Sequence, residues 1–194
     1  MTKQIEFFFD VGSPASYLAW TQLPGLAQRH GAELVYQPML LGGVFKATGN
    51  SSPATVPAKG RYTREDFQRF ARRYGVPLNH SPFFPINTMQ LMRGAAAYLG
   101  TEQFVPYVDA VFQAIWVQEQ DMGNPEVVAE VLGRSGFDMA ELQEKINDPA
   151  VKDRLRQITE RAIERGVFGA PTMFVGEQMF FGQDRLDFVA EALA

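Results

Sequence analysis

Three short segments carry residue types that could bind or activate a small ligand, and the first contains Ser13. Ser13 follows an apolar run at residues 5–9 and precedes Pro14. Ser at the N-cap and Pro at the first helical position are typical of a helix start. The Ser13 hydroxyl would then lie in the positive field of the helix N-terminus, where it can donate a hydrogen bond to an anion such as a thiolate. The alternative is that Ser13 only caps the helix.

Ser13 is not predicted to be a nucleophile itself, because no His or Lys stands beside it in the sequence to act as a base. The chain has 2 histidines, His30 and His80, and they are far apart in the sequence. This spacing supports neither a histidine-based metal site nor a Ser-His-Asp triad. We therefore expect no metal at this site.

The second segment is Ala170–Pro171, directly before an apolar run at residues 172–175. Proline is tolerated at the first residue of a strand. A cis bond here would leave the N–H and C=O groups of Ala170 free to pair with an extended peptide ligand. The alternative is an ordinary turn with the commoner trans bond.

The third segment is Gln183–Asp184, at the start of the last predicted helix. An acidic residue at a helix N-terminus is favoured by capping alone. The functional alternative is that Asp184 accepts hydrogen bonds from the ammonium group of a ligand. Among the aromatic residues, Trp116 is expected in a helical core, or else in the wall of a pocket for an aromatic ligand.

The composition excludes several classes of protein. The 18 Lys+Arg and 22 Asp+Glu residues give a formal charge of −4, which lacks the basic footprint of nucleic-acid binding. No apolar run approaches the roughly 18 residues of a membrane span, and the first residues carry no secretory signal, so we expect a cytoplasmic protein. The chain has no cysteine, which excludes disulfides and a cysteine nucleophile. Thiol chemistry would need a thiol from outside the chain.

Two ends of the chain predict a sheet, and the middle predicts helices. An apolar run at 5–9, a helix at 14–30 and a strand at 33–38 form a β-α-β unit. The last part predicts a helix at 148–166, a hairpin of strands at 172–175 and 178–181, and a closing helix at 186–193. Between them, a loop at 51–57 and four helices are expected; the helices are residues 64–74, 87–99, 102–119 and 125–132.

These elements predict an α/β protein with a mixed four-stranded sheet. A right-handed crossover makes the first two strands parallel neighbours, and the hairpin adds antiparallel strands. The predicted domains are a sheet domain with the pattern β-α-β followed by α-β-β-α, formed by residues 1–40 and 148–194, and an all-helical insertion domain at 41–147.

Several stretches, read together, resemble one family from end to end. They are FDVGSPASYLA at 9–19, GNSSP at 49–53 with VPAK at 56–59 and Tyr62, GVFGAPT at 166–172, and FFGQDRL at 180–186. In order and spacing these stretches resemble the 2-hydroxychromene-2-carboxylate isomerases and their relatives, the kappa-class glutathione transferases. The chain departs from the family pattern at Ala15, where an aromatic residue is common, and at Phe181, where Trp is common. Both are expected to border the pocket of the second substrate.

The resemblance implies a thioredoxin-like fold with a helical insertion, similar to the periplasmic DsbA-like disulfide oxidoreductases but with Ser13 in place of their reactive cysteine. It implies glutathione as cofactor, with Ser13 donating a hydrogen bond to its sulfur and a cis Pro171. The implied contacts to the rest of glutathione come from five further residues: Asn50, Lys59, Ala170, Gln183 and Asp184. It also implies a homodimer.

The implied function is glutathione-dependent cis–trans isomerisation of an aromatic unsaturated keto acid in aromatic-compound catabolism. The thiolate would add to the conjugated substrate, allow rotation about the former double bond and leave again. One alternative is a kappa-class-like transferase that consumes glutathione at the same site. The other alternative is a thioredoxin-fold binding module without catalytic activity.

Overall fold

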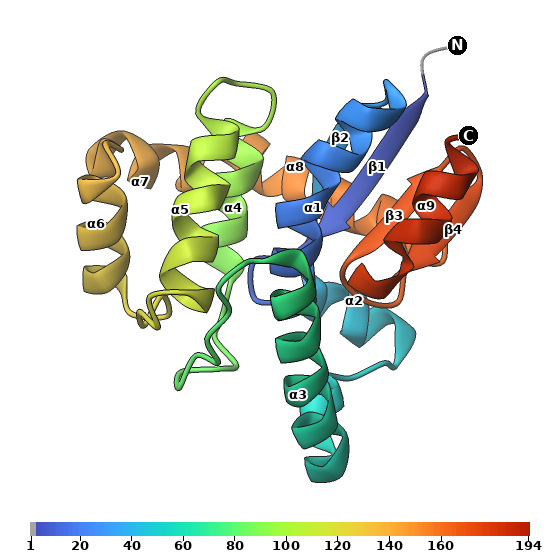
Figure 1. Cartoon of the computed structure of the whole chain (residues 1–194). Coiled ribbons are helices and arrows are strands. Elements are labelled where there is room, and N and C mark those ends of the chain that lie inside the picture. Colours follow the sequence, from blue (N-terminus) through green and yellow to red (C-terminus); the bar gives the residue numbers. More distant parts are fainter. Residues whose placement is uncertain (1–2) are drawn as a thin grey trace.

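The centre of the protein is a four-stranded sheet, seen in a computed structural model that describes residues 3–194 (Figure 1). The strands are β1 (Gln4–Phe9), β2 (Glu33–Pro38), β3 (Thr172–Val175) and β4 (Gln178–Phe181), in the order β2-β1-β3-β4. β1 runs parallel to β2 and antiparallel to β3, and β3 pairs antiparallel with β4. The predicted mixed four-stranded sheet is confirmed.

β1 is apolar on both sides because both faces of the sheet are covered. Ile5, Phe7 and Phe9 point to one face and Phe8 points to the other, and all four side chains are fully buried. A strand buried on both faces reads as a continuous apolar run rather than an alternating one. Each of these side chains contributes about 1.5–3 kcal/mol by its removal from water.

Two layers of helices cover the sheet. On the Phe7 face lie α1 (Pro14–His30) and α9 (Leu186–Ala192), and on the Phe8 face lie α2 (Leu41–Thr48) and α8 (Pro149–Glu164). α3 (Pro57–Tyr74) extends away from the sheet in Figure 1. The remaining helices stand to one side: α4 (Met89–Tyr98), α5 (Phe104–Trp116), α6 (Pro125–Arg134) and α7 (Met139–Asn147).

Some helices differ from the sequence prediction. α2 was not predicted, because Gly42 and Gly43 are poor helix formers, but the helix packs Val44 into the core beneath the sheet. α7 was also not predicted; its N-cap Asp138 accepts hydrogen bonds from two main-chain N–H groups. α3 begins at Pro57 rather than residue 64, and the loop before it contains a short 3-10 turn, Pro53–Thr55.

One apolar core joins the sheet to the helices of the middle region. The Trp20 ring of α1 packs against Phe104 and Phe112 of α5. The Trp116 indole of α5 donates a hydrogen bond to the carbonyl of Val11, at 2.8 Å. The division into residues 1–40 with 148–194 and residues 41–147 stays a prediction. Within residues 3–194, no helix is long and apolar enough to cross a membrane.

Candidate functional site

Ser13 lies where β1 ends and α1 begins. It is the N-cap of α1, and its Oγ accepts a hydrogen bond from the N–H of Ser16 at 3.1 Å. The same Oγ donates to the carbonyl of Ala170 at 3.1 Å. Ser13 therefore does cap the helix. Its single hydroxyl proton points to the Ala170 carbonyl, in the segment before β3.

The segment before β3 contains a cis peptide bond between Ala170 and Pro171. The cis bond that the resemblance implied is thus confirmed. Pro171 is buried, and its carbonyl accepts a hydrogen bond from the N–H of Gly182 at 3.0 Å. This contact connects the Ser13–Ala170 pair to the turn that carries Gln183 and Asp184.

Two main-chain donors beside Ser13 are available to a ligand. Within residues 3–194, neither Ala15 N–H, in the first turn of α1, nor Ala170 N–H has a hydrogen-bond acceptor. Helix N-termini and unpaired N–H groups favour anions. The Ser13 hydroxyl and the Ala15 N–H form a donor set suited to a thiolate, and the Ala170 N–H is suited to the main chain of a peptide.

Asp10 contacts this site directly, because its main-chain carbonyl accepts a hydrogen bond from the N–H of Ser13 at 3.0 Å; local sequence patterns do not predict a role for it. Its carboxylate is 1% exposed and accepts hydrogen bonds from three groups: Gly12 N–H at 2.9 Å, Leu41 N–H at 2.8 Å and Thr88 Oγ1 at 3.1 Å. Burial raises the pKa of Asp10 above its usual range, although the three hydrogen bonds oppose this. The only sequence signal was its place in the FDVGSP stretch.

Gln183 and Asp184 occupy a short 3-10 turn, Gln183–Arg185, after β4. Gln183 is buried, and both its main-chain carbonyl and its Oε1 accept from the Tyr74 hydroxyl, each at 2.9 Å. Burial raises the pKa of Tyr74 to about 12, so Tyr74 remains a donor at neutral pH. Tyr74 was not predicted to contribute, because it stands far from Gln183 in the sequence.

Asp184 is exposed, and its carboxylate accepts from Arg185 at 2.8 Å. Together with Arg73, Tyr74 and Asp187 it borders a small cavity of about 170 Å³. A carboxylate in this position is free to accept from a ligand ammonium on its solvent side.

The two residues predicted from the middle region differ in their placement. Asn50 donates from its side-chain amide to the carbonyl of Phe168 at 2.8 Å, which brings it to the segment that carries Ala170. Lys59 lies in the first turn of α3 and is exposed. In the part of the chain that the structure describes, the Lys59 side chain has no hydrogen bond or ion pair, so no contact brings it to Ser13.

An exposed aromatic pair stands beside Ala170. The rings of Phe168 and Phe181 lie 4.6 Å apart between centroids, and the two residues are 37% and 41% exposed. A side chain at Gly169 would meet the Phe181 ring, at 2.6 Å from its Cβ. The pair offers an apolar surface on which a flat aromatic ligand could pack. Residues 3–194 contain no cluster of three His, Cys, Asp or Glu residues that could hold a metal ion.

The chain resembles known proteins over its full length. A family model of DSBA-like thioredoxin domains matches residues 4–194. A 2-hydroxychromene-2-carboxylate isomerase of Sphingobium xenophagum is 37% identical over 199 residues, which cover 100% of this chain and 99% of that protein. Glutathione S-transferase kappa 1 of Homo sapiens is 28% identical over 212 residues, covering 100% of this chain and 92% of that protein. A solved 2-hydroxychromene-2-carboxylate isomerase structure is 33% identical, with a TM-score of 0.87 over 98% of this chain and 94% of that chain.

Proposed function

The chain belongs to the 2-hydroxychromene-2-carboxylate isomerase family of DSBA-like thioredoxin domains, and on this basis we propose that it is a glutathione-dependent isomerase of an aromatic unsaturated keto acid. The observation that carries the proposal is the Ser13 hydroxyl at the N-terminus of α1, 3.1 Å from the carbonyl before the cis bond of Pro171. The site has donors for a thiolate but, in a chain without cysteine, no thiol of its own.

Glutathione, when bound, supplies a thiolate that adds to the conjugated double bond, allows rotation about it and leaves unchanged. Ser13 turns its hydroxyl proton from the Ala170 carbonyl to the sulfur, while Ser16 N–H continues to hold its Oγ. The helix N-terminus and Ala15 N–H stabilise the same negative charge, because N-terminal donors lower a thiol pKa from its usual value of about 8.5. The Ala170 carbonyl that Ser13 releases becomes free to accept from the cysteinyl N–H of glutathione.

The γ-glutamyl ammonium binds at Asp184 in this proposal, on the turn that Tyr74 holds through Gln183. Asn50, Gln183 and Lys59 contact the remainder of the tripeptide; Lys59, which is exposed, would reach it as a flexible cation. The aromatic ring of the keto acid packs on the Phe168–Phe181 pair. This arrangement holds the substrate carbon beside the sulfur, and such positioning is the main contribution of the protein.

Substoichiometric glutathione tests the reaction. Enzyme, a 2-hydroxychromene-2-carboxylate and a small amount of glutathione should give many turnovers per glutathione. One turnover per glutathione, with the thiol found attached to product, would instead support the kappa-class-like transferase. Absence of saturable glutathione binding would support a binding module without this chemistry.

Ser13→Ala tests the assigned hydroxyl. It should raise the pKa of bound glutathione, followed by thiolate ultraviolet absorbance, and lower kcat about 10²–10³-fold, the range found for loss of one oxyanion donor. Asp184→Asn should weaken glutathione binding about tenfold without moving that pKa, and Asp187→Asn, at the same cavity, is its control. An unchanged thiol pKa in Ser13→Ala would reduce Ser13 to a helix cap.

A further inference from the structure

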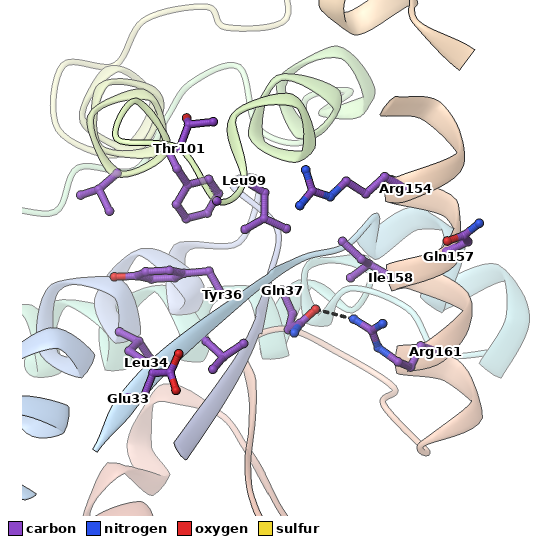
Figure 2. Close-up of a pocket in the computed structure, with 14 residues that line it drawn as sticks. Glu33, Leu34, Tyr36, Gln37, Leu99, Thr101, Arg154, Gln157, Ile158 and Arg161 are labelled. Atoms are coloured by element: carbon purple, nitrogen blue, oxygen red, sulfur yellow. Dashed lines mark hydrogen bonds between the residues drawn. The ribbon is translucent and has the colours of Figure 1, made fainter. Parts of the chain in front are cut away.

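A second cavity lies away from Ser13, along the free edge of β2. It has a volume of about 550 Å³, and residues 33–37 of β2 form its floor. Figure 2 shows its two walls, with Leu99 and Thr101 on one side and Arg154, Gln157, Ile158 and Arg161 of α8 on the other. We call this cavity the β2 groove.

The floor of the β2 groove carries unpaired main-chain groups. Glu33 N–H bonds to the Lys3 carbonyl at 2.8 Å and Met39 N–H to the Phe9 carbonyl at 3.0 Å, so the odd-numbered residues of β2 face β1. In a parallel pair, the even-numbered residues that alternate with these direct their N–H and C=O groups away from the partner strand. Leu34 and Tyr36 therefore present both groups to the groove, and within residues 3–194 no strand pairs with this edge.

The α8 wall of the groove is positively charged. Arg154 donates to the Ala96 carbonyl at 3.1 Å, and Arg161 donates to Gln37 Oε1 at 2.6 Å, the contact drawn in Figure 2. Neither guanidinium forms an ion pair with a carboxylate of residues 3–194. In a chain with a net charge of −4, two arginines without carboxylate partners on one wall favour an acidic ligand.

The opposite wall is mainly apolar. Leu99 lies at the end of α4, and Phe104 and Val105 lie at the start of α5. Val105 is 41% exposed. A strand added to β2 would point alternate side chains at the two walls, because successive residues face opposite sides of a sheet. One set would meet these apolar side chains, and the other set would meet the arginines.

We propose that the β2 groove binds an extended segment of a partner protein as a fifth strand, with acidic and apolar residues in alternation. Such strand addition draws affinity from main-chain hydrogen bonds and specificity from the alternate side chains. The main-chain groups of Leu34 and Tyr36 provide the hydrogen bonds, and the two walls provide the side-chain specificity. A second copy of the chain fits less well, because its own Arg154 and Arg161 would be brought toward the same two arginines of the first copy.

A fluorescein-labelled octapeptide of alternating valine and glutamate tests the proposal by fluorescence anisotropy. It should bind saturably, and the valine–lysine octapeptide should not. Arg154→Gln and Arg161→Gln should each weaken binding roughly tenfold, as expected for loss of one charge-assisted contact. Arg156→Gln is the matched control, because Arg156 is on the same helix but pairs with Asp153 and Glu160 outside the groove.

Two further measurements separate strand addition from simple charge attraction. N-methylation of alternate peptide amides should abolish binding in one register and leave it in the other. Hydrogen exchange should slow at Leu34 and Tyr36 when the octapeptide binds, but not at Val35, whose N–H already faces β1. Glutathione-dependent turnover of the keto-acid substrate should be the same in Arg161→Gln as in the unmodified protein, so the peptide result is independent of the Ser13 site.

The proposal is overturned if the lysine peptide binds as well as the glutamate peptide, or if Leu34 and Tyr36 exchange at unchanged rates in the complex. Protection of these two amides that rises with protein concentration in the absence of peptide would identify a second copy as the occupant, and would likewise overturn it.

Discussion

Asp10 is the residue on which three parts of the site depend. Its carboxylate holds the loop before Ser13 through Gly12, the start of α2 through Leu41, and the residue before α4 through Thr88. α2 leads to Asn50, and the loop carries Ser13. A buried carboxylate with three donors fixes these segments relative to one another, since an unpaired buried N–H would cost about 1–3 kcal/mol.

Replacement of Asp10 by Asn should destabilise the protein by about 1–3 kcal/mol, because an amide NH₂ would face one of the main-chain N–H donors. The pKa of Asp10 is raised above 3.8 in the folded protein, so the native state binds this proton more tightly than the unfolded chain. The stability that Asp10 contributes is therefore greatest below pH 3.8 and declines as the pH rises through the raised pKa. Urea unfolding of the unmodified protein and of Asp10→Asn, from below pH 3.8 to above the raised pKa, measures the difference in stability.

The control for this prediction is Asp138→Asn, at the exposed N-cap of α7. Asn and Asp are about equally good N-caps, so this variant should unfold at nearly the same urea concentration as the unmodified protein. A stability difference for Asp10→Asn that grows with rising pH would contradict the raised pKa.

The candidate site could be predicted from the sequence only where local patterns encode it. Ser13 stands out because Ser before Pro starts a helix after an apolar strand. The contact of Tyr74 with Gln183 could not be predicted, since it joins α3 to a turn far along the chain and depends on tertiary packing. Asp10 is part of the FDVGSP stretch, but its role could not be predicted, because its three donors come from three separate segments.

At the scale of elements, the turn after β4 positions Asp184. Gly182 has a φ of 103°, a conformation that side chains disfavour. A Cβ at Gly182 would also lie 2.5 Å from Asp184 Oδ1. The N–H of Gly182 bonds to the Pro171 carbonyl, so the same glycine joins the cis segment to the proposed γ-glutamyl site.

Gly182→Ala should lower the free energy of unfolding by about 1–3 kcal/mol, the usual cost of a disfavoured backbone conformation. It should also weaken glutathione binding, because the new Cβ displaces the Asp184 carboxylate. Gly176→Ala is the control: Gly176 has a φ of 58°, and a Cβ there would meet nothing within 4 Å. Calorimetry of glutathione binding should separate the two variants, and equal affinity in both would contradict the positioning role of Gly182.

The strands were predictable because each is a short apolar run between turn residues, as in residues 5–9 and 172–175. The helices were less predictable, because the residues at which they begin and end depend on tertiary contacts. Tertiary packing of Val44 and the hydrogen bond from Leu41 to Asp10 outweigh the poor helix propensity of Gly42 and Gly43 in α2.

At the scale of the whole molecule, the core does not stop at the sheet. Phe112 of α5 contacts the rings of Phe9, Tyr17 and Trp20, so the middle region and the sheet share buried side chains. Phe137, by contrast, contacts Tyr98 and Tyr107 within the helices of the middle region. These two phenylalanines therefore report on different parts of the core.

We expect a single unfolding transition, because a shared core couples both predicted domains. Phe112→Ala and Phe137→Ala should each lower the free energy of unfolding by about 3–5 kcal/mol. Native-state hydrogen exchange measures the coupling: amides of β1 and of α4 should exchange with the same free energy of opening, and both variants should lower that value for both elements. Exchange in α4 at a lower free energy than in β1, lowered further by Phe137→Ala alone, would instead make residues 41–147 a separate folding unit. The Ser13 site would then lie beside the boundary with a region that unfolds independently.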